Sequence, residues 1–243
     1  MRKDPHMKPL LLSVAVTLSA AAQQDLFLQA EQAYAQEQYP TAIQHYQSLL
    51  ADGFTQPEIN YNLGNAAFKA GDLPLAIKHY RRAQYDAPSD PDIDANLRFA
   101  LEDSGTTLPE QPLLQHLAFQ LPHHHWLLLT LTLYALLLLT LFLRLFAPRL
   151  KPKTKPLLFL LLTALLISAY ALRIHHQRHR LPEQIVLQPD TPIHFAPLES
   201  STIAFSLPAG TILQPTQTHQ QAWLQIRIND QVGWVQRNKL SSI

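Results

Sequence analysis

Six histidines are the side chains in this sequence whose spacing most suggests chemistry. They form two groups, one before and one after a pair of long apolar segments: His123, His124, His125, His175, His176 and His179. His175 and His179 are four residues apart and would share one face of a helix, a spacing that suits a divalent metal. This predicts metal binding or pH sensing. The alternative is polar residues beside lipid headgroups, and the lack of a neighbouring Asp, Glu or Cys ligand favours it.

The rest of the chain offers no catalytic constellation. It has no cysteine among its 243 residues, which excludes a disulfide framework, a thiolate metal site and a cysteine nucleophile. Its glycines form neither a GxGxxG nor a GxxxxGK phosphate-binding loop. Without paired carboxylates in a motif or a nucleophile beside a base, the sequence predicts a non-enzymatic protein with no cofactor.

Residues 23–105 contain a repeat with a period of 34 residues. Ala42 and Ala76 are one period apart, as are Tyr46 and Tyr80. This period is typical of tetratricopeptide (TPR) repeats, in which each copy is a pair of antiparallel helices. Two copies and part of a third are present, so we expect an all-α TPR solenoid that ends in a single capping helix.

Solenoids of this kind usually bind a partner on their concave face, which the first helix of each pair should supply. The candidate partner-binding residues are Tyr34, Tyr61, Asn65, Phe68, Lys69 and Asn96. For Tyr34 and Phe68, packing within the core is the alternative role. Residues 23–104 hold 12 Asp and Glu against 5 Lys and Arg. This balance favours a basic protein partner and argues against nucleic acid.

Three further segments suggest a membrane protein that is exported. Residues 1–22 combine basic residues, a short apolar run and small residues, as in a cleaved signal peptide. An uncleaved N-terminal anchor is the alternative, and Met7 is a second possible start. Residues 106–125 form a proline-containing linker, and residues 126–146 and 157–174 are apolar enough to be two transmembrane helices.

The orientation of this hairpin follows from its charges. The connecting loop, residues 147–156, together with Arg144, carries five Lys and Arg, whereas the segment between Arg98 and the first span carries none. The positive-inside tendency therefore places the loop in the cytoplasm and both flanks outside. The hairpin is expected to separate two binding modules on the outer side of the membrane.

Residues 182–243 change to short β-prone runs separated by turn residues. The expected strands cover residues 185–187, 191–195, 203–207, 211–213, 223–228 and 233–235. Such short strands predict a small all-β barrel. Leu224, Ile226 and Ile228 alternate with polar residues, so one face of their strand should be buried. Trp223 and Trp234 are candidates either for a ligand platform or for core packing.

The order of residues in this region, Gly210, Trp223 and then Gly233-Trp234-Val235, resembles the bacterial SH3-like domain. Such domains bind peptides or cell-wall material. The full order of segments, with residues 61–65 (YNLGN) and 94–98 (DANLR), resembles the BatE-type TPR protein of the bacterial aerotolerance (Bat) operon. The multidomain fold class is then a TPR solenoid, a two-helix transmembrane hairpin and an SH3-like barrel.

That resemblance implies a place in the bacterial inner membrane, with the TPR and SH3-like domains in the periplasm. It also implies partners among von Willebrand factor A-domain membrane proteins and a MoxR-type ATPase system. The predicted function is a membrane-anchored cell-envelope scaffold that binds partner proteins, linked to aerotolerance. The alternative is a peptidoglycan-binding envelope protein.

Overall fold

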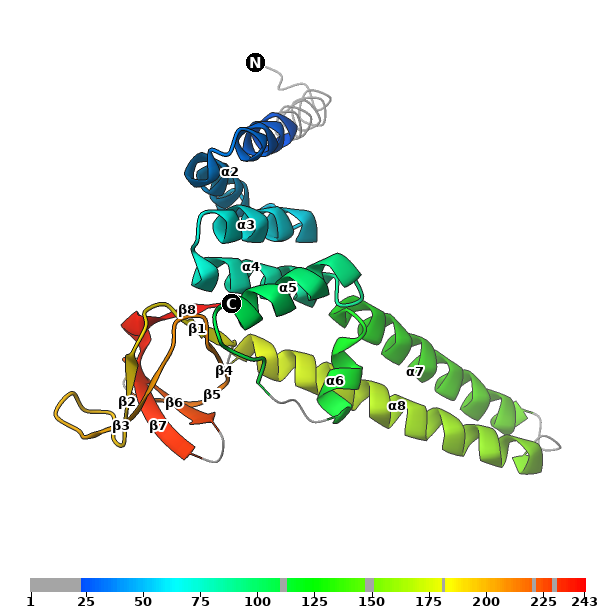
Figure 1. Cartoon of the computed structure of the whole chain (residues 1–243). Helices are drawn as coiled ribbons and strands as arrows, with labels where there is room; N and C mark the ends of the chain where they lie inside the picture. The colour runs from blue at the N-terminus through cyan, green and yellow to red at the C-terminus, as the bar shows by residue number, and fades with distance from the viewer. Residues whose placement is uncertain (1–22, 110–112, 147–150, 181, 220–221, 229–230) are drawn as a thin grey trace, which may run out of the picture.

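The computed structural model of the chain describes residues 23–109, 113–146, 151–180, 182–219, 222–228 and 231–243. These residues form a stack of short helices, a long helical hairpin and an antiparallel β region (Figure 1). The predicted signal peptide, residues 1–22, lies outside the described residues, so it stays a prediction.

Short helices of similar length build the N-terminal part of the described chain. They are residues 23–35, α2 (Tyr39–Ala51), α3 (Pro57–Lys69), α4 (Leu73–Asp86) and α5 (Pro91–Asp103). The helices α2 to α5 each carry a proline in their first two positions, where the missing N–H costs nothing. The Asp72 carboxylate starts α4 by accepting a hydrogen bond from the Leu75 N–H at 3.1 Å. The result is two helix pairs followed by a single helix, as the 34-residue period predicts.

Close contact between the paired helices explains the small residues of the repeat. The Tyr80 ring of α4 lies against Gly64 of α3, where an added Cβ would come within 2.6 Å of Tyr80 Cδ1. Tyr46 occupies a similar place in the first pair and is buried with Ala30 and Ala42. Both tyrosines therefore fill the space between helices that alanine and glycine leave open.

The hairpin consists of α7 (His123–Phe146) and α8 (Lys151–Arg180), which run side by side in opposite directions (Figure 1). Both helices contain a stretch long and apolar enough to cross a membrane. Their ends differ from the prediction. The three histidines 123–125 form the first turn of α7, and residues 151–156, expected in the loop, already belong to α8.

The early start of α8 includes two prolines. Pro152 lies in the first turn of α8, where helices tolerate proline, and Pro156 lies inside the helix, where it removes one backbone hydrogen bond and crowds the carbonyl four residues earlier without ending the helix. The expected linker is also partly ordered, because α6 (Leu113–Phe119) lies within it. The remaining loop residues 147–150 lie outside the described part of the chain.

The β region contains two antiparallel sheets. Their strands are β1 (Gln184–Val186), β2 (Thr191–His194), β3 (Ile203–Leu207), β4 (Ile212–Leu213), β5 (Pro215–His219), β6 (Trp223–Ile228), β7 (Gln231–Gln236) and β8 (Leu240–Ser242). One sheet has the order β4-β1-β8 and the other β3-β2-β7-β6-β5. The strand pairing does not close into the predicted barrel, because strands β1, β4 and β8 pair only with one another. As predicted from its alternation, β6 buries Leu224 and Ile226 and exposes Arg227.

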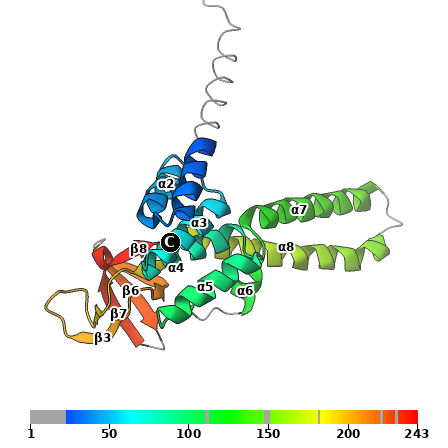
Figure 2. The same ribbon diagram turned by 45° about the horizontal axis from the view of Figure 1, so that its top comes forward.

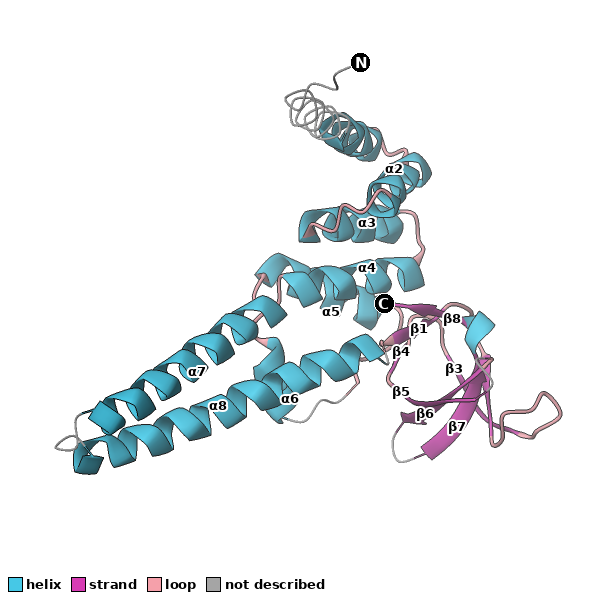
Figure 3. Ribbon diagram, turned by 180° about the vertical axis from the view of Figure 1, so that it is seen from behind, coloured by secondary structure: helices cyan, strands magenta, loops and turns pink. Residues whose placement is uncertain are grey.

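The β region packs directly against the end of the helical stack, which corrects the expectation of two modules separated by the hairpin. Ile185, Ile212 and Ile243 belong to the same buried cluster as Ile77 of α4 and Leu101 of α5. Figures 1 and 3 place the C-terminus beside α5, next to β8. Figure 2 shows the helical stack and the β region at one end of the hairpin, with α7 and α8 extending away from both.

Candidate functional site

A groove across the helical stack contains all six residues predicted for partner binding in that part of the chain. It has a volume of about 360 Å³. Its lining residues are Tyr34, Tyr61, Asn65, Phe68, Lys69, Tyr80, Asn96 and Phe99. The structure thus brings together residues from both helix pairs and from the single helix α5, up to 65 positions apart in the sequence.

The position of these residues follows from helix periodicity. Tyr61, Asn65, Phe68 and Lys69 lie at steps of four, three and one along α3, so their side chains share one face. That face is left uncovered by α2 and α4, which bury Leu63 and Ala67 on the other side. The first helices of successive pairs then lie side by side and form the floor of the groove.

Two asparagines form the polar centre of the groove. Asn96 Nδ2 donates to the Tyr61 hydroxyl at 3.0 Å and to Asn65 Oδ1 at 3.1 Å. The Tyr80 hydroxyl also donates to Asn65 Oδ1, at 2.7 Å. Burial, followed by the neighbouring Tyr61, raises the pKa of Tyr80, so its hydroxyl stays protonated and remains a donor. This network holds both amide side chains in fixed orientations.

The same network leaves two polar atoms for a ligand. Within the described part of the chain, Asn65 Nδ2 donates to no group and Asn96 Oδ1 accepts from none. A free amide donor beside a free amide acceptor matches the N–H and C=O of an extended peptide backbone. The groove can therefore hold a peptide segment without sequence-specific contacts at its centre.

Aromatic side chains provide an apolar wall beside the amides. The rings of Phe68 and Phe99 lie 5.4 Å apart between centroids, and Phe99 is 59% exposed. Phe68 is partly buried against the core, so it serves both packing and the groove wall. Large exposed aromatic rings are common anchor points in protein interfaces.

Sequence reasoning missed Tyr80 and Phe99 as groove residues. Phe99 lies 34 positions after Asn65, so the repeat period would have identified it. Tyr80 marks the repeat period in the sequence, and its ring packs on Gly64. Its hydroxyl reaches the groove because the ring passes over Gly64, which has no side chain, to Asn65.

The helical stack can be compared with known families. Residues 27–91 match the tetratricopeptide repeat family. The TPR match extends from the first helix to the start of α5, and TPR repeats are typically non-enzymatic scaffolds for protein–protein interaction. No curated protein matches the chain.

The two tryptophans of the β region differ in their accessibility. Trp223 is only 7% exposed and packs edge-on against His194, with 5.3 Å between ring centroids. Its burial favours core packing over the alternative of a ligand platform. Trp234 on β7 is partly exposed, so its role as a binding residue stays a prediction. A cleft of about 210 Å³ nearby is lined by other residues, among them His194 and Lys239.

The histidine groups come together only in part. The rings of His123 and His175 lie 5.6 Å apart and those of His124 and His125 lie 4.1 Å apart. His175 is buried and its Nε2 donates to the Ala118 carbonyl at 3.2 Å. Among the described side chains, which do not include that of His179, no three potential ligands converge on a metal position. The metal hypothesis gains no support from this placement.

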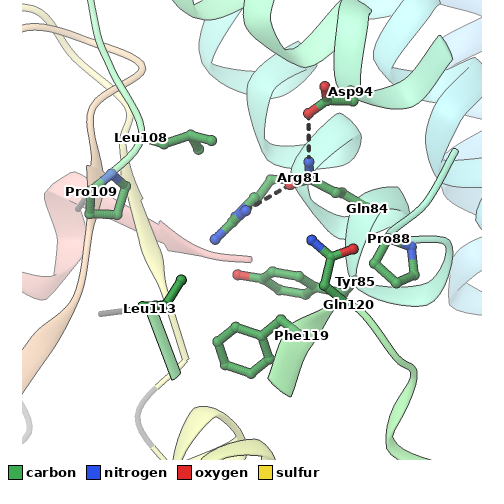
Figure 4. A pocket seen from close by; sticks show the side chains of 10 residues that line it. All are labelled: Arg81, Gln84, Tyr85, Pro88, Asp94, Leu108, Pro109, Leu113, Phe119 and Gln120. Atoms are coloured by element: carbon green, nitrogen blue, oxygen red, sulfur yellow. Dashed lines mark hydrogen bonds between the residues drawn. The ribbon is translucent and has the colours of Figure 1, made fainter. Parts of the chain in front are cut away.

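A second cleft lies between the TPR helices α4 and α5 and the segment that contains α6 (Figure 4). It has a volume of about 430 Å³, and its walls include Arg81, Tyr85, Leu108 and Phe119. Each of the three guanidinium nitrogens of Arg81 donates a hydrogen bond there. Nε and Nη2 donate to the Glu183 carboxylate, both at 2.8 Å, and Nη1 donates to Gln84 at 2.7 Å. The cleft is a structural junction, because its one arginine is neutralised by the β region.

Proposed function

We propose that this protein is a membrane-anchored scaffold whose TPR groove binds an extended segment of a partner protein. The observation that carries the proposal is the pairing of Asn65 and Asn96, which offers one free donor and one free acceptor beside the exposed Phe99. A peptide backbone would satisfy both amides, and an apolar side chain of the partner would cover the Phe99 ring.

The charge of the TPR part defines the partner further. Of its five basic residues, Arg81 binds Glu183 and Lys78 donates to Ser241 at 2.8 Å. Both cations are thus directed at the β region, while the 12 acidic residues remain within the TPR part. A partner segment with net positive charge would be attracted to the acidic surface of the TPR part.

The hairpin is the proposed anchor in the bacterial inner membrane. Leucines of α7 such as Leu128 and Leu139 are exposed along its length, which is expensive in water and favourable in lipid. The TPR and β parts lie at the same end of the hairpin, which suits two flanks on one side of a membrane. With the basic loop in the cytoplasm, that side is the periplasm.

The resemblance to the BatE-type proteins supplies the partner class. We propose von Willebrand factor A-domain membrane proteins as the occupants of the groove, within an aerotolerance system that includes a MoxR-type ATPase. The β region serves as an SH3-like element that is attached to the TPR part. Peptidoglycan binding stays the alternative, with the partly exposed Trp234 as its candidate platform, because the buried Trp223 offers none.

Affinity capture from detergent extracts of the native bacterium tests the groove. The full chain should recover A-domain membrane proteins, and the Phe99→Ala variant should lose them. Phe195→Ala is the matched control, because Phe195 of the β region is 65% exposed and Phe99 is 59% exposed. Equal recovery by both variants would exclude the groove as the binding site, and recovery of no A-domain protein by the parent chain would exclude the proposed partner class.

A further inference from the structure

The short helix α6 presents a row of leucines that the folded chain leaves uncovered. Leu113, Leu114 and Leu117 are 71%, 61% and 53% exposed. By helical periodicity they lie on one side of α6. Residues 113–121 contain no Asp, Glu, Lys or Arg. This is an apolar surface without the charged face that a helix in water normally carries.

The opposite side of α6 is attached to one end of the hairpin. Ala118 and Phe119 pack with Ala171 and Ile174 of α8 and with Trp126 of α7. The Ala118 carbonyl accepts two hydrogen bonds, from Trp126 Nε1 at 2.8 Å and from His175 Nε2 at 3.2 Å. These contacts hold α6 across the ends of both hairpin helices, on the side of the TPR part (Figures 1 and 2).

The position of these contacts along the hairpin indicates which part of a membrane would surround α6. Trp126 lies in the first turn of α7, and Ala171 and Ile174 lie near the end of the apolar stretch of α8, residues 154–176. In a spanning hairpin this level is the boundary between hydrocarbon and headgroups, where tryptophan is enriched. The leucines of α7 are exposed from Leu127 onward, which directly follows the Trp126 that packs with α6.

We infer that α6 is an interfacial helix whose leucines insert into the same membrane leaflet in which the hairpin ends. The occupant of the apolar surface is therefore lipid acyl chain. The inference rests on the proposed membrane anchoring of the hairpin. Inserted beside the hairpin, α6 would set the depth of α7 and α8 in the bilayer and hold the TPR groove at a fixed height above it.

Site-directed fluorescence tests this inference, because the chain contains no cysteine. Leu114→Cys and Leu117→Cys variants of the full chain are labelled with the environment-sensitive dye NBD and reconstituted into phosphatidylcholine–phosphatidylglycerol vesicles. We expect blue-shifted emission and strong quenching by lipids that carry a nitroxide near the headgroup. Leu139→Cys, in the middle of α7, should be quenched most by a nitroxide deep in the acyl chain, and the exposed Gln47→Cys on α2 by neither.

The controls separate the failure of this inference from that of the anchoring. If Leu139→Cys is quenched while Leu114→Cys and Leu117→Cys behave like Gln47→Cys, the hairpin is in the bilayer and α6 is in water. If the α6 probes are blue-shifted but unquenched, a protein surface such as a second copy covers them, and lipid is the wrong occupant. An unquenched Leu139→Cys would overturn the anchoring and the inference together.

Discussion

The buried ion pair between the TPR part and the β region leads to a quantitative prediction for Glu183→Gln. Glu183 accepts three short hydrogen bonds, from Arg81 Nε and Nη2 at 2.8 Å and from the Tyr85 hydroxyl at 2.6 Å. The Arg81 and Glu183 side chains are only 7% and 4% exposed. Burial by itself lowers the pKa of Arg81, but hydrogen bonds and charge from Glu183 more than offset this and raise it.

Glutamine has the shape of glutamate but only one acceptor oxygen and no charge. The Glu183→Gln variant therefore leaves a buried guanidinium without its counter-charge and places an amide N–H₂ against an Arg81 N–H or the Tyr85 hydroxyl. Breaking a buried pair in this way costs about 3–5 kcal/mol. For a protein of this size that corresponds to a fall in Tm on the order of 10 °C.

Thermal unfolding of the full chain in detergent micelles, followed by tryptophan fluorescence, measures this loss, because Trp223 and Trp234 both lie in the β region. Arg98→Gln is the control, since it removes the exposed pair of Arg98 with Asp94 at 3.2 Å and should cost less than about 1 kcal/mol. A Glu183→Gln variant that unfolds at the same temperature as the control would refute the docking of the β region on α4.

Further predictions concern pH, packing and orientation. Burial, with the nearby charges of Lys78 and Arg82, lowers the pKa of His79 from 6.5 to about 3, so between these values only the unfolded chain binds the proton. Stability should therefore fall by roughly 1.4 kcal/mol per unit as pH drops from 6.5 towards 3, and urea titrations should show a shallower fall for His79→Gln. Gly64→Ala should lower stability by about 1–3 kcal/mol despite its better helix propensity, because its Cβ overlaps the Tyr80 ring; a raised Tm would contradict that packing. In spheroplasts, a membrane-impermeant maleimide should label Asn238→Cys but not Lys155→Cys, and the reverse pattern would invert the proposed orientation.

The docking of the β region changes how the protein would hold a partner. Two modules on a flexible tether gain affinity through effective concentration, but here Ile185, Ile212 and Ile243 share a core with α4 and α5. The β region packs on the last two helices of the stack and covers their apolar face, as a capping element does in a solenoid. The groove and the β region therefore belong to one packed unit.

Much of the helical part could be predicted from the sequence because its contacts are local and periodic. The 34-residue step between Tyr46 and Tyr80 reflects helices that pack only on their neighbours, and a face of α3 follows from the spacing of Tyr61 and Asn65. The apolar length of the hairpin is likewise a property of a continuous segment. For these elements, residue order alone determines which side chains share a face.

Only the tertiary structure decided how the parts meet. Arg81 and Glu183 are 102 positions apart, with the whole hairpin between them, and no period links them. The same holds for the pairing of β1 with β4 and β8, which left the barrel open, and for the attachment of α6 through Ala118. Such contacts depend on which surfaces remain apolar or unpaired after local structure has formed, and that information is absent from any single stretch of the chain.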